Sequence, residues 1–195
     1  WLSPSPSPLS STIKSKSPGL NSLIDKSPTL KSDLDRLRKD GWRIDYGPPG
    51  GGSYTDRSAI QPSIILDGDL KAKPAEAVST LSHEVGHALY EYKPDMSSKA
   101  AFVKQALDDE GAATLKNLQV RKEILSNGGP DIGLVGNPAN HANYEKVYNG
   151  FLKNGDSKTA YEKLGSIYGR KEKTSTTGQP YAEYYGQWYE KLSKP

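Results

Sequence analysis

Residues 83–87 read His-Glu-Val-Gly-His, and two of the three histidines in this 195-residue chain fall within these five positions. The letters that this HExxH pattern fixes arise by chance in roughly one chain of this length in a few hundred. Leu81 and Val85 lie opposite the two histidines at helical spacing, which predicts a helix that buries one face. Residues four apart on a helix are about 5–6 Å apart, so His83 and His87 can both reach one metal ion. We therefore expect a metal-binding helix, and we build the rest of the fold around it.

Glu84 lies about 100° from His83 around this helix, beside the metal-facing side and not on it. A carboxylate in that place can act as a general base, taking a proton from a water molecule at the ion. Gly86 costs about 1 kcal/mol in a helix interior, which makes sense if another backbone packs closely there. The alternative is that His83 and His87 are surface residues of an ordinary amphipathic helix.

A zinc hydrolase site needs a third protein ligand and an open fourth position. The chain has no cysteine and only one further histidine, His141, so a carboxylate is the better candidate. Glu110 projects from the centre of an apolar stripe on the next predicted helix, where a carboxylate is costly unless it is paired or bound to a cation. Gly111 and the two alanines after it would let the two helices approach closely. The alternative is a salt-bridged glutamate at a helix contact.

The order of elements predicts an α+β fold, with a small N-terminal β-sheet followed by a mainly helical domain. Strand-like alternation occurs around Ile44 and in Ser63–Leu66, on either side of a glycine-rich stretch at 47–52, so two or three strands are expected. Helices are expected at 74–92, 97–126, 141–153, 157–169 and 180–193. A short helix from Pro28 should precede the sheet and stop at Gly41.

Residues 1–28 hold five Ser-Pro pairs and are predicted to form a linker, or an ordered arm packed through Leu20, Leu23 and Ile24. The folded domain is therefore expected to span 29–195. Because the chain begins at Trp1 and its only methionine is Met96, we expect it to be either processed or cut from a longer polypeptide.

The composition argues against two classes of partner. The net charge of +3 comes from 26 basic and 23 acidic residues that are mostly interspersed, whereas nucleic-acid-binding proteins usually concentrate their basic residues in one patch. No apolar run approaches the roughly 18 residues of a membrane span. We expect neither a nucleic-acid partner nor a membrane span.

The HExxH helix followed by a glutamate 23 positions after His87 resembles the zincin metallopeptidases, and among them the gluzincins. The resemblance implies a zincin-like domain holding one Zn²⁺ on His83, His87 and Glu110, with Glu84 activating water. It also implies that Ser63–Leu66 is the sheet edge on which a substrate peptide lies by β-augmentation.

Residues from about 40 onward also look like the metallopeptidase toxin domains at the C-termini of bacterial secreted effectors and Rhs-type proteins. The likeness runs through His83–Leu89, Asp109–Leu115 and Thr174–Gly186. It implies a domain secreted or delivered into a target cell as part of a larger bacterial protein. Its partners would be a peptide or protein substrate and a cognate immunity protein.

The sequence departs from the gluzincin pattern in one place. Gluzincins often carry an aspartate four residues after the ligand glutamate to orient a histidine, and here that position is Thr114, which leaves the orienting group unassigned. In the register of lethal-factor-like peptidases, Glu183 would be the ligand instead. On its helix, however, Glu183 points away from the apolar face, so Glu110 is preferred.

The developing oxyanion needs a hydrogen-bond donor, usually Tyr or His in such enzymes. Tyr181 is the first choice, and Tyr184 and His141 are weaker ones. The resulting hypothesis is a single-zinc endopeptidase with Glu84 as the base. The rivals are a zinc-stabilised, non-catalytic binding module and a hydrolase that cleaves the peptide cross-links of peptidoglycan.

Overall fold

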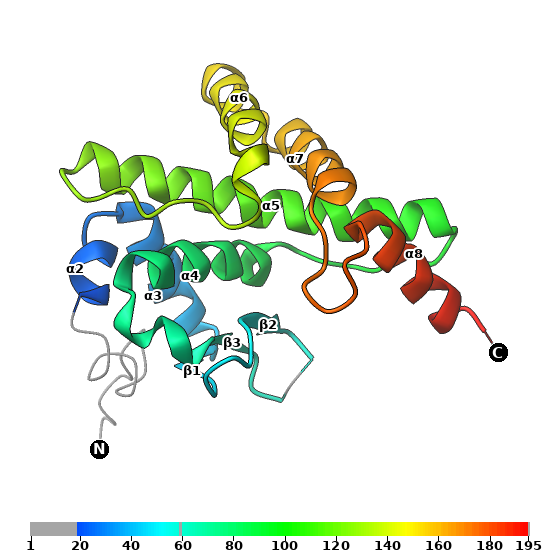
Figure 1. Cartoon of the computed structure of the whole chain (residues 1–195), viewed down its shortest axis with the longest axis horizontal. Coiled ribbons are helices and arrows are strands. Elements are labelled where there is room, and N and C mark those ends of the chain that lie inside the picture. Colours follow the sequence, from blue (N-terminus) through cyan, green and yellow to red (C-terminus); the bar gives the residue numbers. More distant parts are fainter. Residues whose placement is uncertain (1–18, 59, 195) are drawn as a thin grey trace.

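The computed structural model describes residues 19–58 and 60–194, and it consists of helices and one small sheet (Figure 1). The elements are α2 (Leu20–Ile24), α3 (Pro28–Lys39), β1 (Arg43–Tyr46), β2 (Tyr54–Asp56), β3 (Ser63–Leu66), the 3-10 helix η1 (Gly68–Ala72), α4 (Pro74–Leu89), α5 (Lys99–Ser126), α6 (Pro138–Asn154), α7 (Ser157–Lys171) and α8 (Tyr181–Leu192). The predicted α+β class is confirmed. Within the described residues, no helix is both long and apolar enough to cross a membrane.

The segment before α3 packs onto the domain. Leu20, Leu23 and Ile24 of α2 are buried, as in the ordered arm that the sequence offered as the alternative to a linker. The Ser27 side chain accepts a hydrogen bond from the Leu30 backbone N–H at 3.2 Å, and Pro28 fills the first turn, which together start α3. The Ser-Pro pairs before residue 19 lie outside the described residues.

The sheet has the strand order β1-β3-β2, with β1 parallel and β2 antiparallel to β3. The prediction that Ser63–Leu66 is the sheet edge is therefore wrong, because this strand has a neighbour on each side and all four of its residues are buried. The glycine-rich turn brings the chain back so that β2 covers that edge. Asp67 fixes the turn by accepting the backbone N–H groups of Gly50 and Gly52 at 2.9 and 2.8 Å. Among the described residues β2 pairs only with β3, so the sheet edge beside α4 belongs to β2.

Helix α5 runs through the middle of the molecule, with α4 on one side and α6 and α7 on the other (Figure 1). One hydrophobic cluster joins α2, α3, the sheet and α4 to Val120 and Ile124 of α5. A second joins α6 and α7 to Leu115 and Leu118. Helix α4 ends three residues before the predicted boundary because the backbone of Tyr90 turns extended, at ψ 129°.

Two glycines bring α5 into direct backbone contact with its neighbours. A Cβ on Gly86 would lie 2.5 Å from the Ala113 Cα, so the predicted close approach of α4 and α5 is confirmed. Gly111 was expected to contribute to this contact between α4 and α5, but it does not. It faces α7, where a Cβ would lie 2.1 Å from the carbonyl oxygen of Tyr161.

Candidate metal centre

His83, His87 and Glu110 meet at the crossing of α4 and α5. The Oε2 atom of Glu110 lies 3.5 Å from the Nε2 of His83 and 3.4 Å from the Nε2 of His87. One donor atom from each of the three side chains falls within 4.8 Å of the others. His83 and Glu110 are buried, and His87 is nearly so. The structure thus brings together all three residues that the sequence nominated as ligands.

These distances suit a single zinc ion. Two tetrahedral bonds of about 2.0–2.1 Å place their ligand atoms about 3.4 Å apart, close to both separations from Glu110. Oε2 of Glu110 is buried and has no hydrogen-bond partner among the described residues. Such an atom is costly to bury unless a cation or donor satisfies it. Imidazole nitrogen and carboxylate oxygen are donors that Zn²⁺ prefers in proteins.

Asp109 supplies the orienting contact that Thr114 does not. Its Oδ1 lies 3.0 Å from the Nδ1 of His87, which leaves the Nε2 of that ring facing Glu110. Arg57, just after β2, donates to the same Oδ1 at 2.6 Å and to the backbone carbonyl of His87. The Nδ1 of His83 has no such partner in the described part of the chain.

The carboxylates of Glu110 and Asp109 favour a positive charge among the three clustered donors. Burial lowers the pKa of His87, but the charges of Glu110 and Asp109 outweigh burial and raise that pKa well above its usual value. Burial raises the pKa of Glu110, but His87 and His83 outweigh burial and hold it well below its usual range. A proton or a metal cation satisfies the same demand.

Glu84 is held beside the three donors by the edge strand. Its Oε2 accepts a hydrogen bond from the Thr55 hydroxyl of β2 at 2.8 Å, and the same hydroxyl lies 3.0 Å from the Glu84 carbonyl oxygen. Glu84 is not one of the three clustered donors. It lines the same cleft as the three donors.

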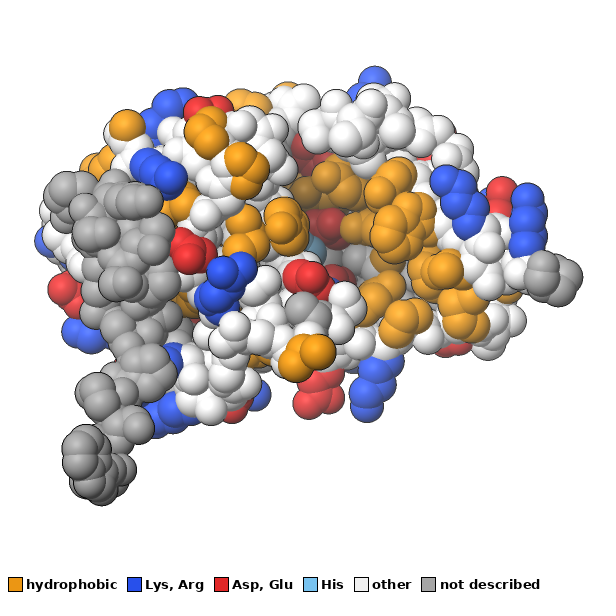
Figure 2. Space-filling view, turned by 90° about the horizontal axis from the view of Figure 1, so that it is seen from below, with side chains coloured by type: hydrophobic (Ala, Val, Ile, Leu, Met, Phe, Trp, Pro, Cys, Tyr) orange, Lys and Arg blue, Asp and Glu red, His pale blue; other side chains and the backbone are white. Residues whose placement is uncertain are grey.

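The three donors and Glu84 lie in a cleft of about 550 Å³, walled by the β2 segment, α4, α5, α7 and α8. Figure 2 shows acidic and histidine side chains at the bottom of a hollow rimmed by hydrophobic ones. Tyr168, Tyr181 and Tyr185 line the cleft, and Trp188 lines it while 48% exposed. Burial and the charge of Glu110 raise the pKa of Tyr181, which keeps its hydroxyl protonated as a donor.

Comparison of the chain with protein-family models, curated proteins and solved structures gives no match. The function of this chain is therefore inferred from the geometry of its cleft.

Three weaker sequence candidates are not brought to the site. Glu183 is exposed on α8 and lies outside the cleft lining, because the inward face of that helix carries Tyr181 and Tyr185. Tyr184 is likewise absent from the lining. His141 lies on α6, beside Tyr144 at 6.4 Å between ring centroids. Of the three residues considered as oxyanion donors, Tyr181 lines the cleft, whereas Tyr184 and His141 do not.

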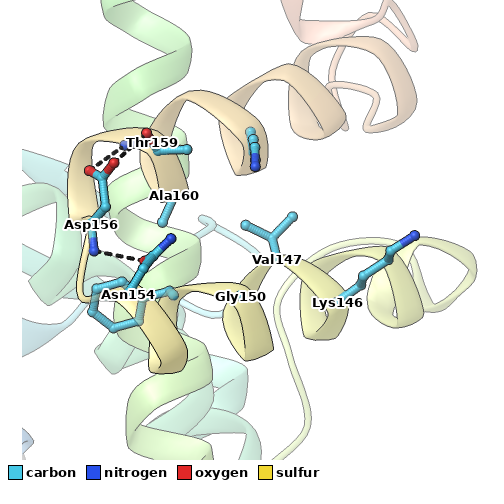
Figure 3. Close-up of a pocket in the computed structure, with 9 residues that line it drawn as sticks. Lys146, Val147, Gly150, Asn154, Asp156, Thr159 and Ala160 are labelled. Carbon is cyan, nitrogen blue, oxygen red and sulfur yellow. Dashed lines mark hydrogen bonds between the residues drawn. The ribbon is translucent and has the colours of Figure 1, made fainter.

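A smaller cleft of about 200 Å³ lies between α6 and α7 (Figure 3). It shares no lining residue with the cleft that holds the three clustered donors and Glu84. Asp156, which lines the smaller cleft, caps α7 through Thr159. No His or Glu lines it, so it offers no comparable chemistry.

Sequence reasoning missed four residues that touch the site: Thr55, Arg57, Asp109 and Tyr185. Asp109 was detectable in principle, since it directly precedes Glu110 and an orienting carboxylate was being sought. Thr55 and Arg57 carried no local signal, because strand pairing alone brings them to α4.

Proposed function

We propose that this protein is a single-zinc peptide-bond hydrolase, an endopeptidase of the zincin type. The observation that carries the proposal is the convergence of His83 Nε2, His87 Nε2 and Glu110 Oε2 in a cleft that also holds Glu84. Three protein ligands in an accessible cleft suit a catalytic zinc site, whereas a structural zinc site normally has four.

When bound, the ion would polarise the substrate carbonyl and acidify the attacking water. Glu84, fixed by Thr55, takes the proton from that water on its carboxylate and delivers it to the leaving amine. The Tyr181 hydroxyl donates a hydrogen bond to the carbonyl oxygen as negative charge develops there.

The unpaired edge of β2 is a reason to propose a peptide as the substrate. An extended peptide can add to this edge by β-augmentation, which would carry its backbone past Glu84. Tyr54 on that strand is 51% exposed, and both Tyr54 and Trp188 line the cleft, where they offer aromatic surface to substrate side chains.

The motif likeness further supports a role as a toxin or effector domain of a larger secreted bacterial protein, opposed by an immunity protein. Its target would be a protein or, with the same chemistry, the peptide cross-links of peptidoglycan. Expression of the domain in the cytoplasm or in the periplasm of a test bacterium separates these targets. Growth arrest confined to periplasmic expression would favour peptidoglycan.

The test of the catalytic role is Glu84→Gln, with Glu76→Gln as the control because Glu76 is an exposed glutamate on the same helix. Glu84→Gln should retain zinc and lose cleavage of a peptide library by a factor on the order of 10²–10⁴. Glu76→Gln should retain both. Wild-type cleavage by Glu84→Gln contradicts the assigned role.

The rival function is a binding module that zinc stabilises without catalysis. In that case removal of zinc should lower the unfolding temperature, and no peptide in the library should be cleaved by the zinc-loaded wild type. Measured zinc content and cleavage by the same preparation decide between the two.

A further inference from the structure

The two carboxylate oxygens of Glu110 have different surroundings. Oε2 faces the imidazoles of His83 and His87 and has no hydrogen-bond partner among the described residues. Oε1 accepts a hydrogen bond of 2.6 Å from the hydroxyl of Tyr185. One oxygen is therefore available to a cation while the other is already occupied by a donor.

Packing of α8 aims the Tyr185 hydroxyl at Glu110. Next to it, Gly186 is buried against Lys99 at the start of α5, where a Cβ would lie 2.8 Å from the lysine Cε. One turn further on, Tyr189 packs on Phe102, with 5.8 Å between ring centroids. At neutral pH a tyrosine hydroxyl carries its proton, so this group is a hydrogen-bond donor to Glu110.

Tyr181 and Tyr185 are one helical turn apart, with 5.9 Å between their ring centroids, and both line the cleft. Only Tyr185 donates to Glu110. Of these two hydroxyls, the one of Tyr185 is thus occupied by its contact with Glu110.

We propose that Tyr185 is a positioning residue that keeps Glu110 a one-oxygen metal ligand and so preserves a coordination position for the substrate. The inference rests on the metal site proposed above. Carboxylates bind cations through one oxygen or two, and a second oxygen from Glu110 would fill the position that hydrolysis needs. A hydrogen bond to a charged acceptor is strong enough to hold Oε1 away from the ion.

The experiment compares Tyr185→Phe with wild type, using Tyr189→Phe as the matched control. Each protein is titrated with Co²⁺, whose visible absorption is strong in four-coordinate sites and weaker in five-coordinate ones. Tyr185→Phe should show weaker absorption per bound ion and bind Co²⁺ about tenfold more weakly, because its ligand glutamate is no longer oriented. Tyr189→Phe should match wild type.

A second measurement needs no variant. The infrared carboxylate bands of wild type, recorded as a zinc-loaded minus zinc-free difference, should show the wide separation of a one-oxygen carboxylate ligand. A narrow, two-oxygen separation overturns the inference, as does a Tyr185→Phe protein with wild-type absorption and affinity. A wild type that binds neither Co²⁺ nor Zn²⁺ overturns the metal site itself, and with it the role of Tyr185.

Discussion

Gly86→Ala should disrupt the metal centre without touching any metal ligand. The new Cβ would lie 2.5 Å from the Ala113 Cα and 3.0 Å from the Ala112 carbonyl oxygen, whereas ordinary contacts begin at 3.4 Å. Both opposing atoms belong to the backbone of α5, so no side chain can swing aside. The two helices must therefore separate by roughly 1 Å where they cross.

Such a shift acts directly on the ligand set, because His87 adjoins Gly86 and Glu110 lies one turn before Ala113. Separations of 3.4 and 3.5 Å would grow to roughly 4.5 Å, beyond the about 3.4 Å that one tetrahedral zinc spans. Zinc affinity should fall at least tenfold. The added methyl group overpacks the contact, which lowers the free energy of unfolding by about 1–3 kcal/mol. Replacing glycine by alanine within a helix raises it by about 1 kcal/mol. The variant should therefore be less stable than wild type by up to about 2 kcal/mol.

The assay measures zinc affinity by competition with a chromophoric chelator and follows unfolding in the absence of zinc. Gly150→Ala is the control, since Gly150 lies in α6 with no atom within 4 Å of the added Cβ. The control should keep wild-type zinc affinity and gain about 1 kcal/mol. If Gly86→Ala keeps both the zinc affinity and the stability of wild type, the close contact of α4 and α5 does not set the ligand geometry.

Two further predictions concern side chains around the core. Asp109→Asn should bind zinc about 10–100-fold more weakly, because His87 loses its orienting carboxylate. Asp108→Asn, on the same helix, is the control and should leave zinc affinity unchanged. Equal losses of affinity in both variants would contradict the orienting role. Hydrogen bonds from Arg121 hold the pKa of Asp131 at about 2, below its value of about 3.9 in an unfolded chain. This pair should therefore stabilise the fold above pH 4 and stop doing so as the pH falls through 2. Because Asp131 is half exposed, the contribution should stay below about 1 kcal/mol, and urea unfolding of Asp131→Asn should converge with wild type at low pH.

Local periodicity was enough to predict the longer helices and the three clustered donors. The His83 and His87 spacing is a property of one helix, and the burial of Glu110 follows from the apolar stripe of another. Gly86 indicated a close helix contact, because glycine destabilises a helix interior and such a contact is a reason for its presence there.

What the sequence could not provide depends on pairing between distant segments. The place of β2 at the sheet edge, and with it the contact of Thr55 with Glu84, follows from strand order, which alternation of residue types does not encode. In the sequence, the spacing of Tyr185 places it only on the apolar face of the last helix. Its role as a donor to Glu110 emerges only where α8 docks on α5.

The glycine contacts on both sides of α5 also bear on which ion the site can select. With Gly86 pressed against Ala113 and Gly111 against Tyr161, the helix that carries Glu110 has no room to move sideways. An ion such as Ca²⁺, which takes six to eight oxygen ligands at about 2.3–2.6 Å, would need a wider cage with more oxygens. At the proposed metal site, this fixed spacing of the backbones would favour a small ion over a larger one, in addition to the preference that the donor atoms impose.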